Sequence, residues 1–486
     1  MIKRFLSDRR GSYALSMAVA AIPLLLAAGM AIDYSRQTSS QKHLQELADA
    51  ASLTLARSEE TSPVKLRKMA EDMIFSNQSH GRVEQVRIAF LEAKDDWVDV
   101  RLAGSIPTTF MGLANIDRLD VSASSLAERA ITGNLEVALV LDNTWSMSAT
   151  DSRGVSRIAA LKIAAASLVT ELFRKGGDAV KIGLVPFADY VNVGTRYRKA
   201  SWLDVPDDYS VQPKARTCQT LTTKRVCLKS KPTYACYNVV DGLREKRTCG
   251  GGCEKSQVRT VPAYNSCRGG GSPQKYTWYG CVGSRKKKDL RLTDAEPAEK
   301  YPGFLGTLQR CLNPILPLTN DKGKLLAAAS SMIINIGSYK PGTYIPAGLI
   351  WGQNILSPSQ PFTEGAAYHE ANVRPRKVLV LMTDGENTLR FNGADGMHPN
   401  LSTNAVTAAG QVKQTNKDTA EICDYIQSNK IEVFTVAFMV TNKDAKALLQ
   451  NCASTPAHFY DASDAQKLLD AFTGIGDSLQ QVRLAR

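Results

Sequence analysis

Apolar and polar positions divide the chain of 486 residues into stretches of different character. Residues 13–33, with the sequence YALSMAVAAIPLLLAAGMAID, contain no charge before Asp33 and are long enough to cross a bilayer as one helix. Helical spacing of apolar residues then continues, which predicts an amphipathic stalk over Leu44, Leu47, Ala48, Ala51 and Leu55. Residues 84–126 alternate polar and apolar positions, and we expect them to form a small sheet against this stalk.

From residue 135 onwards, strand and helix patterns follow one another along the chain. Short apolar runs predict strands at residues 137–141, 180–193 (a strand or a hairpin), 377–382, 431–439 and 459–461. Apolar residues spaced along one helix face predict helices at residues 158–172, 324–336, 345–355, 419–430 and 464–482. This alternation is typical of an α/β fold with a doubly wound, mostly parallel sheet.

A block in the middle of the chain interrupts the alternation and carries the excess charge. The chain has 60 Lys and Arg against 47 Asp and Glu, a net charge of +13 and a pI near 9.2. Residues 212–311 hold 20 of the basic and 7 of the acidic residues, so the remainder, with 40 of each, is neutral. The basic excess is therefore local and argues against nucleic-acid binding by the whole protein. The Arg-Lys-Lys-Lys run at residues 285–288 fits a solvated loop.

Eight of the ten cysteines lie in this basic block. The block is rich in Gly and Lys and has few aliphatic runs, so it needs cross-links to fold. An even number of cysteines favours disulfides in an oxidising compartment over zinc, for which Cys249 and Cys253 offer one weak C-x3-C spacing. The sequence leaves the pairing open among Cys218, Cys227, Cys236, Cys249, Cys253, Cys267, Cys281, Cys311, Cys423 and Cys452.

Four basic residues precede the apolar run, namely Lys3, Arg4, Arg9 and Arg10. They favour a cytoplasmic leader at residues 1–12, a transmembrane helix at residues 13–33 and export of everything that follows. This orientation agrees with the disulfides expected downstream. The alternative is a cleaved signal peptide, although the apolar run exceeds the usual length of such a peptide.

The segment DRRGSYALSMAVAAIPLLLAAGMAIDYSR, followed by HLQELADAASLTLA, resembles the start of TadE/TadG-like tight-adherence (Flp) pilus assembly proteins. The shared features are Arg-Arg-Gly before the apolar run, a small residue and Asp at its end, and the Leu-Gln…Ala-Asp-Ala-Ala helix. Gly11 is similar to the glycine after which prepilin peptidase cuts pseudopilins, but Ser16 replaces the usual glutamate. Cleavage after Gly11 or near Ala31 therefore stays open.

Three oxygen-bearing side chains stand at alternate positions of one turn directly after the strand at residues 137–141: Asp142, Thr144 and Ser146. A carboxylate and two hydroxyls at this spacing can direct three oxygens to one point, and hard cations such as Mg²⁺ and Ca²⁺ prefer oxygen ligands. Taken alone, the turn fits the capped start of a helix equally well.

Two further residues extend this group. Thr343 stands just before a predicted helix, and Asp384 follows the strand at residues 377–382. The carboxyl edge of a parallel sheet is where α/β folds build their sites. The three pieces together resemble the metal-ion-dependent adhesion site of the von Willebrand factor A (vWA) domain, whose motif is D-x-S-x-S followed by Thr and Asp. The segments GLIWGQNILSP, LMTDGEN and FTVAF are similar to the vWA half of TadG-like proteins.

The resemblance implies a metal site that holds Mg²⁺ (or Ca²⁺ or Mn²⁺) and is formed by Asp142, Thr144, Ser146, Thr343 and Asp384. In this family the hydroxyls usually bind the ion directly and the acids partly through water. An acidic group of a partner then completes the coordination. Thr144 replaces the first serine of the motif and keeps its hydroxyl. Trp145 stands where glycine is common, and we expect it to place a bulky, exposed ring in the loop.

The expected organisation has a stalk helix and small β region at residues 34–130. The vWA domain follows in two parts, residues 135–194 and 320–482, separated by a basic, Cys-rich insertion at residues 195–319. The sequence contains no nucleophile elbow, no HExxH helix and no P-loop, and its five histidines are scattered. We therefore expect no enzyme and no small-molecule substrate.

The expected protein is a single-pass protein of the bacterial inner membrane, with its N-terminus in the cytoplasm and most of the chain in the periplasm or exported to the surface. We expect it to act in tight-adherence pilus assembly or adhesion, by cation-dependent binding to pilus assembly proteins or other proteins that offer an acidic residue. The alternative is a surface or matrix adhesin whose basic insertion binds an anionic polymer while the vWA core is a scaffold.

Overall fold

The structure is a computed structural model that describes residues 12–58, 60, 62–77, 83–94, 97–128, 134–296, 299–370, 372, 375–480 and 483–485. The chain forms two units, one made of Met1–Gly133 with Leu479–Arg486 and the other of Asn134–Ser478. Apart from Ser12, the expected leader, with its basic residues and Gly11, lies outside the described residues.

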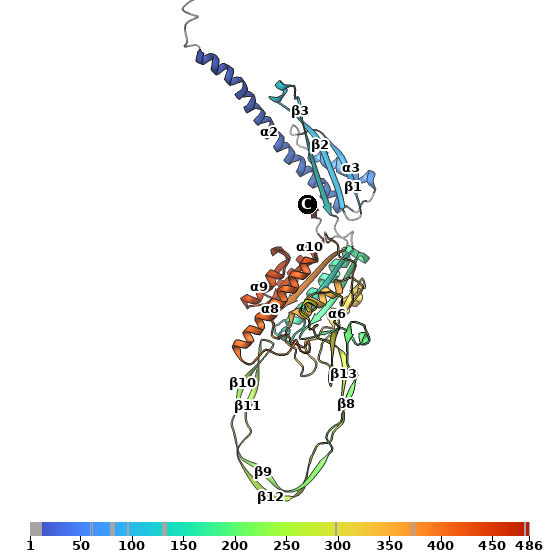
Figure 1. Ribbon diagram of the computed structural model, residues 1–486, viewed down its shortest axis with the longest axis vertical. Helices are drawn as coiled ribbons and strands as arrows, with labels where there is room; N and C mark the ends of the chain where they lie inside the picture. Colours follow the sequence, from blue (N-terminus) through green and yellow to red (C-terminus); the bar gives the residue numbers. More distant parts are fainter. Residues whose placement is uncertain are drawn as a thin grey trace, which may run out of the picture. The chain divides into compact units, whose positions relative to one another are not determined.

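The first unit begins with one long helix, α2 (Ser12–Arg57). It contains the apolar residues 13–33 and runs without interruption into the expected stalk (Figure 1). Among the described residues, Met17–Arg57 is the helix that is long and apolar enough to cross a membrane, as an anchor or a signal sequence does. Large apolar side chains such as Leu24 and Leu25 are exposed on it, which is the surface that lipid covers in a spanning helix.

The C-terminal half of α2 packs on an antiparallel sheet of order β1-β2-β3-β19. The strands are β1 (Glu84–Ala93), β2 (Trp97–Pro107), β3 (Arg118–Glu128) and β19 (Arg483–Ala485). All five predicted stalk residues are buried, beside Val98 and Val100 of β2. A second helix, α3 (Pro63–Asn77), was not predicted and covers part of the same core.

Asp33 joins α2 to the loop between β2 and β3. Its carboxylate accepts hydrogen bonds from the backbone N–H groups of Thr109, Phe110 and Met111 at 2.8–2.9 Å. Met111 is the first residue of the short 3-10 helix η2 (Met111–Ala114). The first N–H groups of a helix have no hydrogen-bond acceptor within the helix, and here Asp33 supplies one. A Cβ on Gly29 would lie only 2.5 Å from the Phe110 side chain, so this close approach requires glycine.

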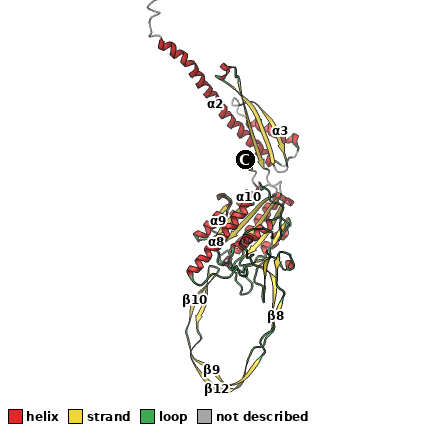
Figure 2. Cartoon of the chain, viewed as in Figure 1, coloured by secondary structure: helices red, strands yellow, loops and turns green. Residues whose placement is uncertain are grey.

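The second unit, in which strands and helices pack together (Figure 2), is built on a six-stranded sheet. Its order is β15-β5-β4-β16-β17-β18. Its strands are β4 (Leu135–Asp142), β5 (Val180–Phe187), β15 (Leu316–Thr319), β16 (Arg376–Thr383), β17 (Glu432–Phe438) and β18 (Phe459–Ala462). All neighbours are parallel except β15, which runs antiparallel to β5 at one edge. Every residue of β4 is buried, so both faces of the sheet are covered. The predicted doubly wound sheet is confirmed.

The sheet is covered by α4 (Arg157–Gly176), α6 (Lys322–Ser330), α7 (Ile345–Leu356), α8 (Ala405–Ser428), α9 (Lys443–Cys452) and α10 (Ala465–Gln480). α7 is buried along its whole length and packs with α8, while α4 packs with α6 and α10. Short helical turns complete the unit: η3 (Trp145–Ser148), η4 (Gly177–Ala179), η5 (Thr195–Tyr197), α5 (Lys288–Arg291) and η6 (Pro456–His458).

Three helix predictions differ from the structure. α6 ends at Ser330 instead of residue 336, and α8 begins at Ala405 instead of residue 419. The first half of α8 is mostly solvent-facing and its apolar residues are small and scattered, so no apolar stripe marks it in the sequence. α9 was not predicted, although its buried residues Ala445, Leu449 and Cys452 stand at helical spacing.

Part of the expected insertion belongs to the core of the second unit. A sheet of order β6-β13-β14-β7 consists of β6 (Val191–Asn192), β13 (Gln274–Val282), β14 (Tyr301–Gly306) and β7 (Leu203–Asp204), with β8 (Tyr209–Val211) paired to β13. Trp202, Trp278 and Tyr301 are buried in the same core as β4 and α7. β15 of the main sheet also lies before the expected boundary at residue 319. The expected insertion at residues 195–319 is therefore too wide, because its flanks fold onto the domain.

The remaining part of the insertion is a two-stranded ribbon. It is formed by β9 (Thr217–Ser230), β10 (Thr233–Val240), β11 (Leu243–Gly250) and β12 (Cys253–Arg268), with β9 paired to β12 and β10 paired to β11. Most of its side chains are exposed. Figure 1 shows the ribbon leaving the unit beside β8 and β13, while the β10–β11 hairpin returns to the same unit.

The predicted disulfides are confirmed, and all ten cysteines are paired. Cys218–Cys267, Cys227–Cys253 and Cys236–Cys249 cross-link the two strands of the ribbon, which has almost no buried apolar surface of its own. Cys423–Cys452 joins α8 to α9. The three disulfides of the ribbon therefore supply the stabilisation that a hydrophobic core provides elsewhere.

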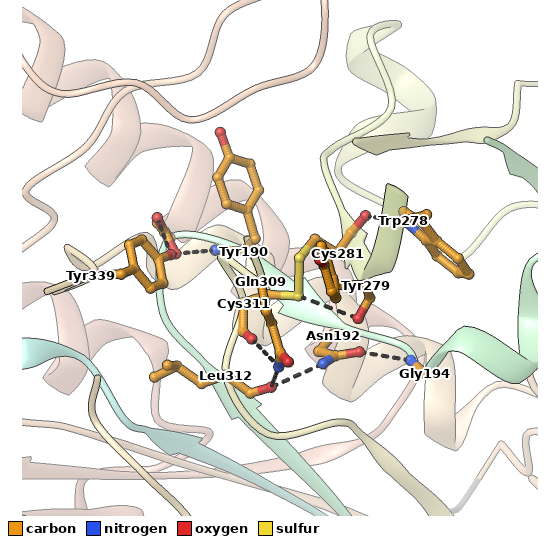
Figure 3. Close-up of a disulfide and its surroundings, with 11 residues drawn as sticks. Tyr190, Asn192, Gly194, Trp278, Tyr279, Cys281, Gln309, Cys311, Leu312 and Tyr339 are labelled. Atoms are coloured by element: carbon orange, nitrogen blue, oxygen red, sulfur yellow. Dashed lines mark hydrogen bonds between the residues drawn. A yellow bond between two sulfur atoms is a disulfide. The ribbon is translucent and has the colours of Figure 1, made fainter. Parts of the chain in front are cut away.

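The disulfide Cys281–Cys311 joins β13 to the segment that follows β14, and Figure 3 shows it close to Asn192. Beside it, the Asn192 side chain donates a hydrogen bond to the Leu312 carbonyl and accepts one from the Gly194 N–H, both at 2.9 Å. These contacts hold the end of the insertion against β6. The strands that carry the ribbon are thereby fixed to the domain.

Candidate metal centre

The five predicted site residues come together at the carboxyl edge of the sheet. Asp142 is the last residue of β4, and Asp384 follows the end of the neighbouring strand β16. Thr144 and Ser146 lie in the turn after β4, and Thr343 precedes α7. None of the five is more than 7% exposed.

Four of these residues form a continuous row of oxygen atoms. Ser146 Oγ lies 2.7 Å from Asp384 Oδ1 and 2.8 Å from Thr144 Oγ1, and Thr144 Oγ1 lies 3.2 Å from Thr343 Oγ1. Adjacent oxygen ligands of an octahedral Mg²⁺ are about 3.0 Å apart, since each lies about 2.1 Å from the ion. The spacing in this row fits the edges of such a coordination shell.

Asp142 lies behind the row. Its Oδ1 accepts a hydrogen bond from the Thr144 N–H at 2.9 Å, and its Oδ2 accepts one from the Thr383 hydroxyl at 2.6 Å. The first bond sets the shape of the turn that presents Thr144. This position suits an acid that holds a cation through a water molecule and through its charge.

The acids of the site are held in an environment that disfavours their charge. Burial, reinforced by the negative charges of Asp384 and Asp241, raises the pKa of Asp142 well above its usual value. Burial also raises the pKa of Asp384, although the nearby Arg157 guanidinium opposes this shift. The Arg157–Asp384 ion pair, at 2.7 Å, therefore balances only part of the negative charge.

This arrangement fits a divalent cation. Buried carboxylates that share one site favour the charged form only if a cation compensates them. In the described part of the chain, no group of three or more His, Cys, Asp or Glu side chains is arranged to hold a metal ion. The oxygens that stand beside these carboxylates are the hydroxyls of Thr144, Ser146 and Thr343, and oxygen is the ligand atom that a hard cation prefers.

Asp241 is a further acid at this site that the sequence analysis did not identify. It lies in the turn between β10 and β11, and its Oδ2 accepts a hydrogen bond from the Ser146 N–H at 2.7 Å. Its Oδ1 accepts from the hydroxyls of Thr343 and Thr388 at 2.9 and 3.0 Å. The Asp-Gly pair between two strand-like runs is a strong hairpin signal, but it carries no information on where the hairpin docks.

Trp145 is half-buried, so the prediction of an exposed ring is wrong. Its Nε1–H donates a hydrogen bond to Glu245 of β11 at 2.7 Å, and the Lys340 ammonium lies 4.0 Å from the centre of its ring. Lys340 also pairs with Glu245 at 2.5 Å. The bulky residue at this position of the motif is thus a contact for the insertion.

A cavity of about 790 Å³ lies beside the candidate metal centre and the tip of the β10–β11 hairpin. The hairpin residues Asn238–Leu243 line one side, and Ser146, Arg157, Thr343 and Asp384 line the other. Met439–Asn442, which follow β17, close a further side. The cavity leaves room beside Asp241 for groups from outside the chain.

The basic run at residues 285–288 is only partly solvated. Arg285 is buried, donates hydrogen bonds to the carbonyls of Thr293 and Ala295, and lies over the Tyr301 ring. The exposed remainder, from Lys286 to Lys288, fits the predicted charged loop. The run as a whole therefore offers less cationic surface than the sequence indicates.

Two sequence profiles match parts of the chain. Residues 360–474 match the von Willebrand factor type A domain, in agreement with the doubly wound sheet and the residues at its carboxyl edge, so the second unit is a vWA domain. Residues 11–56 match the Flp pilus-assembly TadE/G-like family. The chain thus contains a TadE/G-like segment and a vWA-type domain. No curated protein matches it in sequence.

Solved structures with a similar arrangement include three pilus proteins. The pilus adhesin SpaC of Lactobacillus rhamnosus GG is 11% identical over 83% of this chain and 35% of its own, with a TM-score of 0.35. The PilB minor pilin of Streptococcus sanguinis is 13% identical over 83% and 80%, with a TM-score of 0.37. The vWF domain of the type V pili tip protein Mfa5 of Porphyromonas gingivalis is 11% identical over 71% and 95%, with a TM-score of 0.34. This chain spans about a third of SpaC, and similarities this low support no functional argument.

Proposed function

We propose that this protein acts outside the cytoplasm in the assembly of Flp-type pili or in adhesion by them, and that it binds a protein partner through a divalent cation. The TadE/G-like segment at residues 11–56 supports the link to pili. The cation dependence rests on one observation: the row of closely spaced oxygens from Asp384, Ser146, Thr144 and Thr343, with Asp142 behind it.

In this proposal the hydroxyls of Thr144, Ser146 and Thr343 are the direct ligands of Mg²⁺, or of Ca²⁺ or Mn²⁺. Asp142 and Asp384 supply the negative charge that retains the ion and hold the hydroxyls in place through their hydrogen bonds. The bound cation would supply a positive centre for an acidic group of the partner. We propose binding and not catalysis, because the carboxylates are engaged in holding the ion.

We further propose that α2 anchors the protein in the bacterial inner membrane, with the vWA domain on the periplasmic side. The apolar helix Met17–Arg57 and the five disulfides support this arrangement, since disulfides persist in an oxidising compartment. A fusion of alkaline phosphatase after residue 480 tests the orientation. Activity of the fusion in intact cells is expected, and an inactive fusion would overturn the assignment.

The cation site is tested by titrating the full-length protein in detergent with Mn²⁺. We expect Asp142→Ala to weaken binding by at least about 10-fold, since loss of supporting groups around a metal costs 10–100-fold. Asp470→Ala, which removes an exposed acid on α10, is the matched control and should bind as the wild type does. Equal affinity of the wild type and Asp142→Ala would refute the proposed site.

Partner binding is tested with the same variants as bait on membranes of the organism that encodes the protein. We expect pilus assembly proteins to be retained in Mg²⁺ and released by a chelator, and Asp142→Ala to retain none. Retention that is unaffected by both the chelator and the substitution would remove the cation from the binding mechanism. A binding role for the domain would then need another surface.

The alternative adhesin function is favoured by one observation, the exposed basic side chains on β9 and β12. Lys224, Arg225 and Arg259 are all solvent-exposed there. Replacing these three residues by Gln should abolish binding to immobilised dextran sulfate, while Lys413→Gln with Lys443→Gln should not. Deleting the whole block is a poor test, since β13 and β14 belong to the domain core.

A further inference from the structure

We infer that Asp241, at the tip of the β10–β11 hairpin, supplies the carboxylate that completes the coordination of the cation, so that the insertion closes the adhesion site of its own chain. An acidic group of a partner then has to displace this hairpin. The inference rests on the proposed function, because it concerns the occupation and regulation of the same site.

The first observation is the position of the Asp241 carboxylate. Its Oδ1 lies 2.9 Å from Thr343 Oγ1, so it extends the row of oxygens beyond its last member with the same spacing. Its Oδ2 accepts a hydrogen bond from the Ser146 N–H at 2.7 Å. The carboxylate therefore contacts the Thr343 hydroxyl and the backbone of Ser146, so it lies beside the hydroxyl set where a ligand from a partner would have to bind.

The second observation is the turn that presents this carboxylate. Val240 pairs with Leu243, so Asp241 and Gly242 form a two-residue hairpin turn. Both have positive φ, at 49° and 77°. This is the type I′ turn that Asp-Gly favours. The turn places the short Asp241 side chain at the outermost point of the hairpin.

The third observation is a separate contact that holds the hairpin in place. Glu245, on β11, pairs with Lys340 and accepts a hydrogen bond from Trp145 Nε1. Lys340 lies one residue before the Pro341–Gly342 segment that leads to Thr343, and Trp145 lies between Thr144 and Ser146. Each partner of Glu245 thus belongs to a loop that carries ligand hydroxyls. Docking of the hairpin and the shape of the site are therefore coupled.

The hairpin is also built to be released. Val239, Tyr237 and Tyr234 are each more than half exposed, so little apolar surface holds β10 to the domain. Its two strands are joined by Cys236–Cys249, so the tip keeps its form when it leaves. A segment held by a few polar contacts opens at low free energy. A carboxylate of a partner that reaches the cation through the cavity therefore competes with the Asp241 carboxylate of a weakly held hairpin.

The test uses full-length protein in detergent, with Mn²⁺ as the cation and acetate as the competing carboxylate. We compare the wild type with Asp241→Asn, which keeps the shape of the turn and removes the charged ligand. Glu254→Gln is the matched control, because Glu254 is an exposed acid of the same ribbon that pairs with Lys229. Two quantities are measured: the Kd for Mn²⁺, and the relaxation rate of water protons, which reports water bound to the ion.

We expect Asp241→Asn to raise the Kd for Mn²⁺ about 10-fold and to raise the proton relaxation rate, because water takes the vacated position. Acetate should reverse both changes in this variant and leave the wild type and Glu254→Gln unaffected. Glu245→Gln should give an intermediate acetate response, since it loosens the hairpin and keeps the ligand.

Equal Kd and equal relaxation in Asp241→Asn and the wild type would overturn the inference and leave the cation site intact. Absence of Mn²⁺ binding to the wild type would instead refute the proposed function itself. Mixing the two variants tests whether the hairpin acts on a second copy, because Asp142→Ala keeps the hairpin acid and Asp241→Asn keeps the cation site. If mixing lowers the proton relaxation rate of Asp241→Asn to the wild-type value, the hairpin closes the site of another molecule, and closure within one chain is overturned.

Discussion

His398 should make the stability of the vWA domain depend on pH. The side chain is 3% exposed and stacks on Tyr344 with the ring centres 3.8 Å apart. Its Nε2 lies 2.9 Å from the Ser284 hydroxyl, and its Nδ1 contacts the Asp189 carbonyl. A neutral ring satisfies both contacts, with Nδ1–H as donor and Nε2 as acceptor.

Burial lowers the pKa of His398 from 6.5 to about 3. The folded domain therefore rejects a proton that the unfolded chain accepts. The resulting stabilisation is fully present above pH 6.5 and is lost progressively as the pH falls towards 3. At pH 5 the loss is about 2 kcal/mol, since each pH unit below 6.5 costs about 1.4 kcal/mol.

The assay compares urea unfolding of the wild type and His398→Gln at pH 7.5, 6 and 5, with the disulfides intact. Gln keeps one donor and one acceptor but does not titrate. The stability difference between the two proteins should therefore shrink by about 2 kcal/mol between pH 7.5 and 5. A difference that is constant with pH would refute the reasoning.

Three further changes test other contacts. Lys377→Met should destabilise the domain by about 3–5 kcal/mol in urea unfolding. Lys377 and Glu136 are both 1% exposed and pair at 2.6 Å, so the substitution leaves a buried carboxylate without its cation. Replacing Cys423 and Cys452 together by Ala should cost about 3–4 kcal/mol in the same assay, since the disulfide closes a loop with a sequence separation of 29. Asp33→Ala should destabilise the first unit by about 2 kcal/mol and speed amide hydrogen exchange at residues 109–111, whose N–H groups lose their acceptor.

Each of these expectations has a control. Adding Glu136→Leu to Lys377→Met should recover most of the stability. If Lys377→Met alone is as stable as the wild type, the Lys377–Glu136 ion pair contributes nothing to stability. An unchanged unfolding midpoint without Cys423 and Cys452 would rule out loop closure as a source of stability. Asp49→Ala, on the same helix as Asp33, should leave exchange at residues 109–111 unchanged.

The sheet could be predicted from the sequence because its central strands are buried on both faces. β4 and β16 therefore read as unbroken apolar runs, and the acids that follow them mark the carboxyl edge. α10 was predicted within a few residues, since its apolar positions repeat at helical spacing. The solvent-facing first half of α8 has no such stripe, so its start could not be predicted from the apolar pattern.

The division between domain and insertion could not be read from local composition. Residues around β13 and β14 are basic and rich in Gly, yet Trp278 and Tyr301 are buried in the domain core. Burial depends on which surfaces meet, and a mixed composition leaves that open. The disulfide pairing was open for the same reason, because it depends on which strands lie opposite each other.

The sequence by itself determined the α/β class and the apolar helix, because each follows from a periodicity within a few residues. The grouping of Asp142, Thr144, Ser146, Thr343 and Asp384 at the sheet edge followed from the resemblance to the vWA motif. The sequence also contained the Asp-Gly turn of the hairpin. Only the tertiary structure decided that Asp241 meets Ser146, 95 residues earlier, and Thr343, 102 residues later. The path of a long exposed ribbon is set by its cross-links and by the few contacts at its tip, and neither leaves a periodic signal in the chain.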